Sequence, residues 1–340
     1  MAVSDKAFNA IVERCRLALQ LKYEHGNESQ ERPLLDAELR LIQRRGFQEA
    51  LGEIVEFADQ LLDHGTTLHA IGAGGSSVIL FLLGFSDVDP VRYRTHFQRL
   101  WCTSNGEPPT VQFVVLPADG NPWEDIPRPP CVTVHSMTAL EAIPALVCRQ
   151  LPDVPVRMAE KAVFAAIQSG DTDGIFQLET EPVRSRLSKM RPSSIQDLAT
   201  LTVVEQIRLC HPEIAETFNV EHEQELPLPI VFQETIMERL HRQGRVPWDE
   251  TYRFVQAAVK GTAGHVNAMK AEFDLQVDQD HAAEDEGLLN QLTEASQWAV
   301  CRAHHVANAI TSYRAAYYRT FHRQAFENAL QRVSDWDRAH

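Results

Sequence analysis

A turn rich in glycine and serine constrains the fold of this chain more than any other segment. Residues 71–77 read Ile-Gly-Ala-Gly-Gly-Ser-Ser, and the apolar run 78–85 follows directly. Glycines have no Cβ, so backbone N–H groups can surround an anion, and a helix that begins after them adds its positive end. The turn predicts either a phosphate-binding strand-to-helix connection or a tight turn without a ligand. The candidate phosphate or nucleotide ligands are Gly72, Gly74, Gly75, Ser76 and Ser77.

The next β-branched run, which should form the strand beside this turn, carries no acidic side chain. Residues 109–116 read Pro-Thr-Val-Gln-Phe-Val-Val-Leu. Phosphoryl transfer needs carboxylates that hold divalent metal ions on the reacting phosphate. The sequence therefore predicts a fold suited to phosphate that has no metal site.

Apolar periodicity divides the chain into two helical parts with strands between them. Helical spacing is evident over residues 5–65 and again from about residue 155, whereas 110–116 and 131–134 are short β-branched runs bounded by turn residues. We expect an α+β fold. Residues 1–67 form an N-terminal helical segment, residues 68–150 a small unit of strands and helices, and residues 151–340 a helical domain. The last helix, roughly 298–332, is rich in arginine.

Charge and cysteine usage exclude several classes of protein. The chain has 47 acidic and 32 basic side chains, a formal net charge of -15, which disfavours tight autonomous binding to nucleic acid. The six cysteines form no C-x-x-C pair, which argues against a zinc knuckle and favours a reducing compartment. The longest apolar run is too short to span a bilayer. We expect a cytoplasmic protein without a metal, a cofactor or a membrane contact.

Five motifs in collinear order resemble the alpha subunit of bacterial DNA polymerase III. Residues 82–90 read Leu-Leu-Gly-Phe-Ser-Asp-Val-Asp-Pro where the family has L-L-G-I-T-D-V-D-P, and residues 170–179 read Gly-Asp-Thr-Asp-Gly-Ile-Phe-Gln-Leu-Glu where it has G-D-T-x-G-V-F-Q-L-E. Residues 189–198, 232–237 and 301–317 are similar to three further family motifs. The resemblance implies a small nucleotidyltransferase-like palm with a mixed sheet at 68–150 and a helical fingers region at 151–340.

This sequence differs from the family pattern at the positions that carry the family's catalytic chemistry. The family's metal-binding aspartates correspond to Thr110, Gln112 and Val114, and the strand expected to carry the third aspartate, 131–135, also has no acid. The resemblance also implies a truncated relative without the family's phosphoesterase, clamp-binding and oligonucleotide-binding regions. The positions that match nucleotide-contacting residues of the family, or carry positive charge on the last helix, are Lys260, Arg302, His304, Arg314 and Arg319.

These features predict a catalytically inactive polymerase relative in DNA replication or repair. It would bind DNA or a nucleotide weakly at the cleft between palm and fingers, or bind a replication protein. The alternative is an acidic protein–protein scaffold that binds no nucleic acid. A third hypothesis is a repurposed nucleotidyltransferase that uses other acids.

Overall fold

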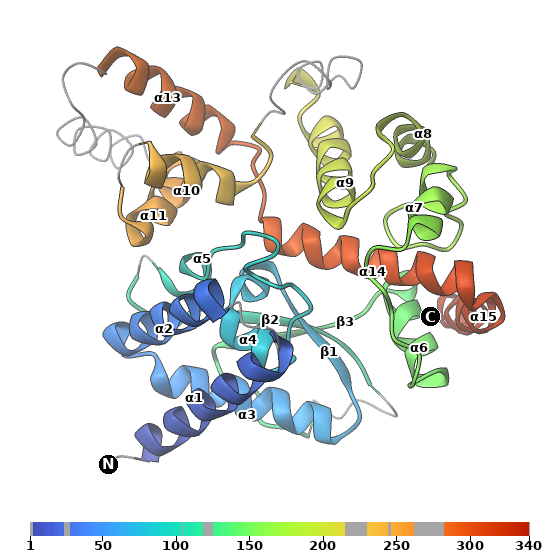
Figure 1. Cartoon of the computed structure of the whole chain (residues 1–340), viewed down its shortest axis with the longest axis horizontal. Helices are drawn as coiled ribbons and strands as arrows, with labels where there is room; N and C mark the ends of the chain where they lie inside the picture. Colours follow the sequence, from blue (N-terminus) through green and yellow to red (C-terminus); the bar gives the residue numbers. More distant parts are fainter. Residues whose placement is uncertain are drawn as a thin grey trace.

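The computed structural model describes residues 3–23, 28–103, 105–117, 125–214, 230–243, 246–261 and 282–339. Figure 1 shows an arrangement dominated by helices around one small sheet. The elements in chain order are α1 (Val3–Lys22), α2 (Glu28–Arg45), α3 (Gln48–Asp63), β1 (Thr67–Ile71), the 3-10 turn η1 (Gly72–Ser76), α4 (Val78–Leu82), α5 (Gln98–Trp101), β2 (Val111–Leu116), β3 (Val132–Ser136), α6 (Ala139–Gln150), α7 (Lys161–Gln168), α8 (Glu181–Met190), α9 (Ile195–Cys210), α10 (Gln233–Arg242), α11 (Trp248–Val259), α13 (Ala282–Ala295), α14 (Arg302–Phe321) and α15 (Arg323–Ala339).

The sheet is mixed, as expected. Its order is β1-β2-β3, with β1 antiparallel and β3 parallel to the central strand β2. Strands β2 and β3 lie within two residues of the ranges expected from the sequence, whereas β1 was not predicted as a strand. The long helical stretches on either side confirm an α-rich α+β chain. Among the described residues, no helix has the length and hydrophobicity to cross a membrane.

Alternation along β2 divides the core between the two faces of the sheet. Successive side chains of a strand point to opposite faces. Phe113 and Val115 join a cluster built with α1 to α4, whereas Val114 and Leu116 join a larger cluster built with α6 to α9, α14 and α15. One face of β2 is thus covered by the N-terminal helices and the other by helices from the second half of the chain.

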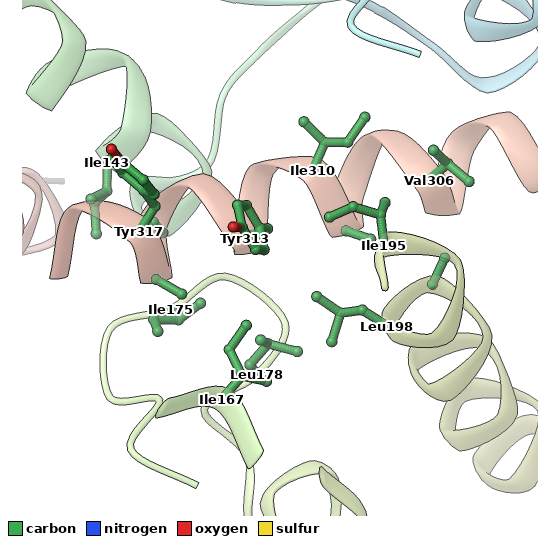
Figure 2. Packing of buried hydrophobic residues seen from close by; sticks show 14 of the residues in the cluster. Ile143, Ile167, Ile175, Leu178, Ile195, Leu198, Val306, Ile310, Tyr313 and Tyr317 are labelled. Carbon is green, nitrogen blue, oxygen red and sulfur yellow. The ribbon is translucent and has the colours of Figure 1, made fainter. Parts of the chain in front are cut away.

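Helix α14 organises the larger cluster. It crosses the middle of the molecule between the sheet and helices α7 to α9 (Figure 1). Figure 2 shows Tyr313 of α14 on the side of Leu178 and Leu198, and Tyr317 beside Ile143 of α6. Burying an isoleucine or leucine side chain contributes about 1.5–3 kcal/mol. This packing holds α14 against both halves of the chain.

The long C-terminal helix expected from the sequence is two helices. The chain turns at His322, whose φ of -135° and ψ of 50° end α14, and α15 begins at the next residue. No glycine or proline marks this break, so periodicity alone could not locate it. The turn lets Phe326, Ala329 and Val333 of α15 enter the larger cluster, and α15 packs against α6. Burial of this apolar stripe accounts for the break.

A third cluster is built by α10, α11 and α13. Met237 and Leu240 of α10, Phe254 of α11 and Leu292 of α13 are its buried centre. This group of helices meets the start of α14, where Gln233 at the start of α10 donates its backbone N–H to the carbonyl of Val300 at 2.9 Å.

Candidate functional site

The anion position at the glycine-rich turn is filled by the chain's own carboxylate. Ser77 caps α4, accepting the N–H of Leu80 at 3.1 Å, and its hydroxyl donates to Oε1 of Glu38 at 2.6 Å. The other carboxylate oxygen of Glu38 accepts the backbone N–H groups of Val78 and Ile79 at 2.8 and 3.3 Å. Oε1 also accepts the indole N–H of Trp101 at 2.7 Å. A carboxylate from α2 therefore stabilises the first turn of α4.

Burial and hydrogen bonding have opposite effects on the pKa of the Glu38 carboxyl group. Glu38 has no exposed surface. Loss of solvent raises the pKa of Glu38 to about 7, although the hydrogen bonds from Ser77, Trp101, Val78 and Ile79 favour the ionised form.

The glycines of the turn allow close approach of neighbouring segments. A Cβ on Gly75 would lie 3.3 Å from the Cβ of Ala303 on α14, and a Cβ on Gly74 would lie 3.3 Å from the Cβ of Ala70. Gly72 has a φ of +60°, a conformation that L side chains rarely adopt. The hydroxyl of Ser76 donates to the carbonyl of Ala73 at 2.6 Å. The turn thus has packing and backbone reasons for its composition.

The positions that the sequence resemblance aligns with the family's metal-binding aspartates lie along β2 and just before it. Thr110 precedes the strand and is exposed, Gln112 is exposed, and Val114 is 7% exposed. Gln112 and Val114 share a sheet face because they are two residues apart. In the register of the sheet, Val114 is flanked by His69 on β1 and His135 on β3.

A cavity of about 320 Å³ opens beside Val114, between the sheet, α6 and α14. Asp87, His69 and Arg314 line it, and His69 and Arg314 both bind Asp87. Nδ1 of His69 lies 2.9 Å from Oδ2 of Asp87, and the guanidinium of Arg314 makes two bonds to the same carboxylate at 2.6 and 2.7 Å. Burial by itself would raise the pKa of Asp87, but the charges and hydrogen bonds of His69 and Arg314 hold it well below its usual value.

Glu141 is the second carboxylate of the cavity lining. It forms the capping box of α6, where its Oε2 accepts the backbone N–H of Thr138 at 3.1 Å and lies 3.4 Å from the Thr138 hydroxyl. Within the described ranges, no group of three or more histidine, cysteine, aspartate or glutamate side chains is arranged to hold a metal ion.

The three arginines of α14 that the sequence singles out all bind groups of this chain. Arg302 donates to the carbonyl of Arg94 at 2.6 Å and to Glu238 at 2.8 Å. Arg314 binds Asp87, as described above, and Arg319 donates to the carboxylate of Asp171 and to a backbone carbonyl. The arginine side chains of α14 therefore form hydrogen bonds and ion pairs that link this helix to neighbouring segments of the chain.

The remaining candidates lie apart from the cavity. His304 is half-buried on α14, and burial, aided by the charge of Arg99, lowers its pKa. Lys260 is exposed at the end of α11. Neither residue lines the cavity, and neither does any residue of the turn from Gly72 to Ser77. Of the sequence candidates, the structure brings Val114 and Arg314 together there.

Sequence reasoning missed the other polar groups of the cavity. His69 follows an apolar residue on β1 and has no motif, and Glu141 reads as part of an ordinary helix start. Asn308 and Thr311 line the cavity from α14. Asn308, Thr311 and Arg314 are spaced three positions apart, and this spacing is the one sequence signal that they share a helix face.

Comparison with known proteins gives two family matches. Residues 9–111 match the family described as the bacterial DNA polymerase III alpha NTPase domain. Residues 148–222 match the bacterial DNA polymerase III alpha subunit finger domain, of which residues 215–222 lie outside the described part of the chain. The first match covers the N-terminal helices, β1, the glycine-rich turn and the start of β2, and the second runs from the end of α6 through α9.

Curated relatives agree with these matches. The chain is 44% identical over 43 residues to DNA polymerase III subunit alpha of Staphylococcus aureus (strain COL) and to the same protein of Staphylococcus epidermidis. That segment is 13% of this chain and 4% of each relative's length. On the two family matches and these relatives, the chain is a DNA polymerase III alpha-like protein.

Proposed function

We propose that this protein is a catalytically inactive relative of the polymerase alpha subunit that serves DNA replication or repair as a non-enzymatic accessory factor. The main support for this proposal is that the strand β2 beside the cavity presents neutral side chains where a polymerase would need carboxylates. Gln112 and Val114 stand where the family pattern has metal-binding aspartates, and neutral side chains bind magnesium poorly because it prefers carboxylate oxygens.

The carboxylates that do line the cavity support the same proposal. Asp87 is held by Arg314 and His69, and Glu141 is held at the start of α6. A two-metal mechanism needs carboxylates that can bridge two ions about 3.5–4 Å apart. Turning Asp87 and Glu141 toward such ions would break a bidentate ion pair and a helix cap. This weighs against the hypothesis of a repurposed nucleotidyltransferase.

Primer extension tests the absence of catalysis. We expect no incorporation on a primed template with magnesium or manganese. Extension by the wild type that disappears in Asp87→Asn or Glu141→Gln, and persists in the exposed control Arg40→Gln, would contradict the proposal. Extension that persists equally in all three variants would point to a contaminating polymerase, which a further purification step removes.

We propose that the accessory role operates through a replication protein and in the cytoplasm. The arginines of α14 are engaged within the chain, so this helix does not present a free row of cations to a DNA backbone. The net charge of -15 opposes extended contact with nucleic acid and suits a basic protein surface. All six cysteines are free, in keeping with a reducing compartment.

DNA or nucleotide binding at the cavity between the sheet and α14 is the second candidate. The observation that favours it is the presence of Arg314, Asn308 and Thr311 around a volume of about 320 Å³. Fluorescence anisotropy with single-stranded, duplex and primed DNA distinguishes binding of DNA from binding of a protein partner alone. Contact with several phosphates makes log affinity fall steeply as log salt concentration rises. Such a slope, weakened by Arg314→Gln, would favour DNA over the protein partner.

A further inference from the structure

A second cavity, about 210 Å³ in volume, lies where the segment after α4 meets α9, α10 and the start of α14. Arg92 and Arg94 line it from that segment, Gln196 from α9, Glu238 from α10 and Arg302 from α14. On α14, Arg302 and Val306 belong to this cavity, whereas Thr311, Arg314 and Tyr318 belong to the one beside Val114. At 100° per residue these two sets occupy different faces of the helix, so the two cavities are separate sites.

The lining of this cavity carries unbalanced positive charge. Arg302 is balanced by Glu238, at 2.8 Å, and that carboxylate also lies 3.2 Å from His96. Arg92 and Arg94 are exposed, and neither guanidinium has a hydrogen bond or an ion pair within the ranges that the structure describes. The lining has three arginines and one carboxylate, so two of its positive charges have no anionic partner among the described residues.

The segment that carries the two free arginines is held in a defined conformation. The carboxylate of Asp89 accepts the backbone N–H groups of Val91 and Arg92 at 3.0 and 3.1 Å. Arg94 has a φ of 52°, in the left-handed region that L side chains rarely adopt, and its carbonyl accepts the 2.6 Å bond from Arg302. The guanidinium of Arg92 lies 5.5 Å from the centre of the Tyr93 ring. Both arginines therefore begin from an ordered backbone, which lowers the entropy lost when a ligand binds.

We propose that this cavity binds a terminal phosphate, the phosphate monoester group of a small molecule or of a nucleic acid end. Guanidinium groups match phosphate oxygens in paired hydrogen bonds. A phosphate monoester carries about -1.5 to -2 charges near neutral pH, which balances the two free arginines, whereas an internal phosphodiester carries a single charge. The cavity is smaller than the roughly 300–1,000 Å³ typical of drug-sized ligands, so it suits a head group. Nε2 of Gln196 donates one N–H to the carbonyl of Arg92 at 3.4 Å, and its second N–H adds a neutral donor to the lining.

This inference goes beyond the proposed accessory function and does not rest on it. A protein without polymerase activity can bind a terminal phosphate, and a protein with such activity can lack this site. Primer extension therefore does not test the phosphate site, and the phosphate-binding measurements do not test the proposal that the protein lacks catalysis.

The test replaces the two exposed arginines together, as Arg92→Gln/Arg94→Gln. The control is Arg40→Gln/Arg332→Gln, which removes the same charge from exposed positions on α2 and α15. Inorganic phosphate and thymidine monophosphate are titrated by calorimetry. Anisotropy is measured with a short single-stranded oligonucleotide that ends in a phosphate or in a hydroxyl. All four arginines are exposed, so we expect unchanged circular dichroism in both variants.

We expect the wild type to bind at least one phosphate probe, the Arg92/Arg94 variant to bind it at least tenfold more weakly, and the control to stay within twofold. Tenfold preference for the phosphorylated oligonucleotide identifies a nucleic acid end as the source, and binding of free phosphate or monophosphate alone identifies a small phosphate ester. Either result supports the site. The proposal is overturned if no probe binds at low salt, if the control loses as much affinity, or if the hydroxyl-ended oligonucleotide binds equally well.

Discussion

Replacing Arg314 by methionine should show how strongly α14 is bound to the segment after α4. The guanidinium makes two hydrogen bonds to the carboxylate of Asp87, at 2.6 and 2.7 Å. The two side chains are 30% and 27% exposed, between a surface pair and a fully buried one. Methionine keeps most of the apolar stem of arginine and removes the charge.

The expected magnitude follows from this partial burial. Breaking a fully buried pair costs about 3–5 kcal/mol, whereas an exposed pair contributes about 0–1 kcal/mol. His69 remains 2.9 Å from the carboxylate in the variant and limits the loss. We therefore expect Arg314→Met to lower the free energy of unfolding by about 2–3 kcal/mol. Asp87→Asn should lower it by about 2 kcal/mol, and the double variant by little more than either single one.

The assay is urea unfolding of the four proteins at neutral pH, analysed as a double-mutant cycle. The exposed pair Arg323–Glu327, 2.8 Å apart on α15, serves as the control and should show no measurable coupling. If the effects of Arg314→Met and Asp87→Asn add within about 0.5 kcal/mol, the two side chains do not stabilise each other and our reasoning is wrong.

The coupling should also depend on pH in one direction. The folded-state pKa of Asp87 is lowered, so its stabilisation is complete above the unfolded-state pKa of about 3.9. It is lost as pH falls below that value toward the folded-state pKa. Equal coupling at pH 8 and pH 6, with a decline below about pH 4, is the expected pattern.

Three further predictions concern buried contacts. Gly75→Val should destabilise the protein by about 1–3 kcal/mol in urea unfolding, because a Cβ at this position would lie 3.3 Å from the Cβ of Ala303. The control is Gly52→Ala in α3, where an added Cβ meets no neighbouring atom. This substitution should stabilise the protein by about 0.5–1 kcal/mol. Tyr313→Phe should cost about 2 kcal/mol, since the hydroxyl bonds two backbone groups before α7 at 2.8 and 2.9 Å; a loss below about 0.5 kcal/mol would contradict this. The folded-state pKa of Glu38 is raised to about 7, so this group favours the folded state only while it is protonated. Ionisation of Glu38 should therefore lower the free energy of unfolding of the wild type by about 3 kcal/mol between pH 4.5 and 7. Glu38→Gln should remove that decline. An unchanged pH profile in Glu38→Gln would show that the group ionises normally.

Much of the fold could be predicted from local pattern. Apolar residues at helical or alternating spacing indicated the helices and the strands β2 and β3, because these periods follow from backbone geometry alone. The absence of acids from 109–116 was equally visible. The break at His322 was not, because it depends on α15 packing against α6 rather than on a local signal.

The candidate site could be predicted less well. The sequence indicated that Arg302, Arg314 and Arg319 are positive and share one helix. It contained no sign that each is already paired within the chain, because Asp87 and Arg314, for example, are 227 residues apart. The glycine-rich turn was a similar case, since the carboxylate of Glu38 that occupies its anion position comes from a helix 39 residues earlier.

The amino-acid sequence by itself determined most of the secondary structure, the acidic balance, the likeness to DNA polymerase III alpha and the absence of acids from β2. These properties depend on residue type and near neighbours. Only the tertiary structure decided which charges are neutralised and which remain free. Arg314 is held by Asp87, whereas neither Arg92 nor Arg94 has a carboxylate partner in the part of the chain that the structure describes. An arginine is best able to bind a phosphate where folding has left its guanidinium without a carboxylate.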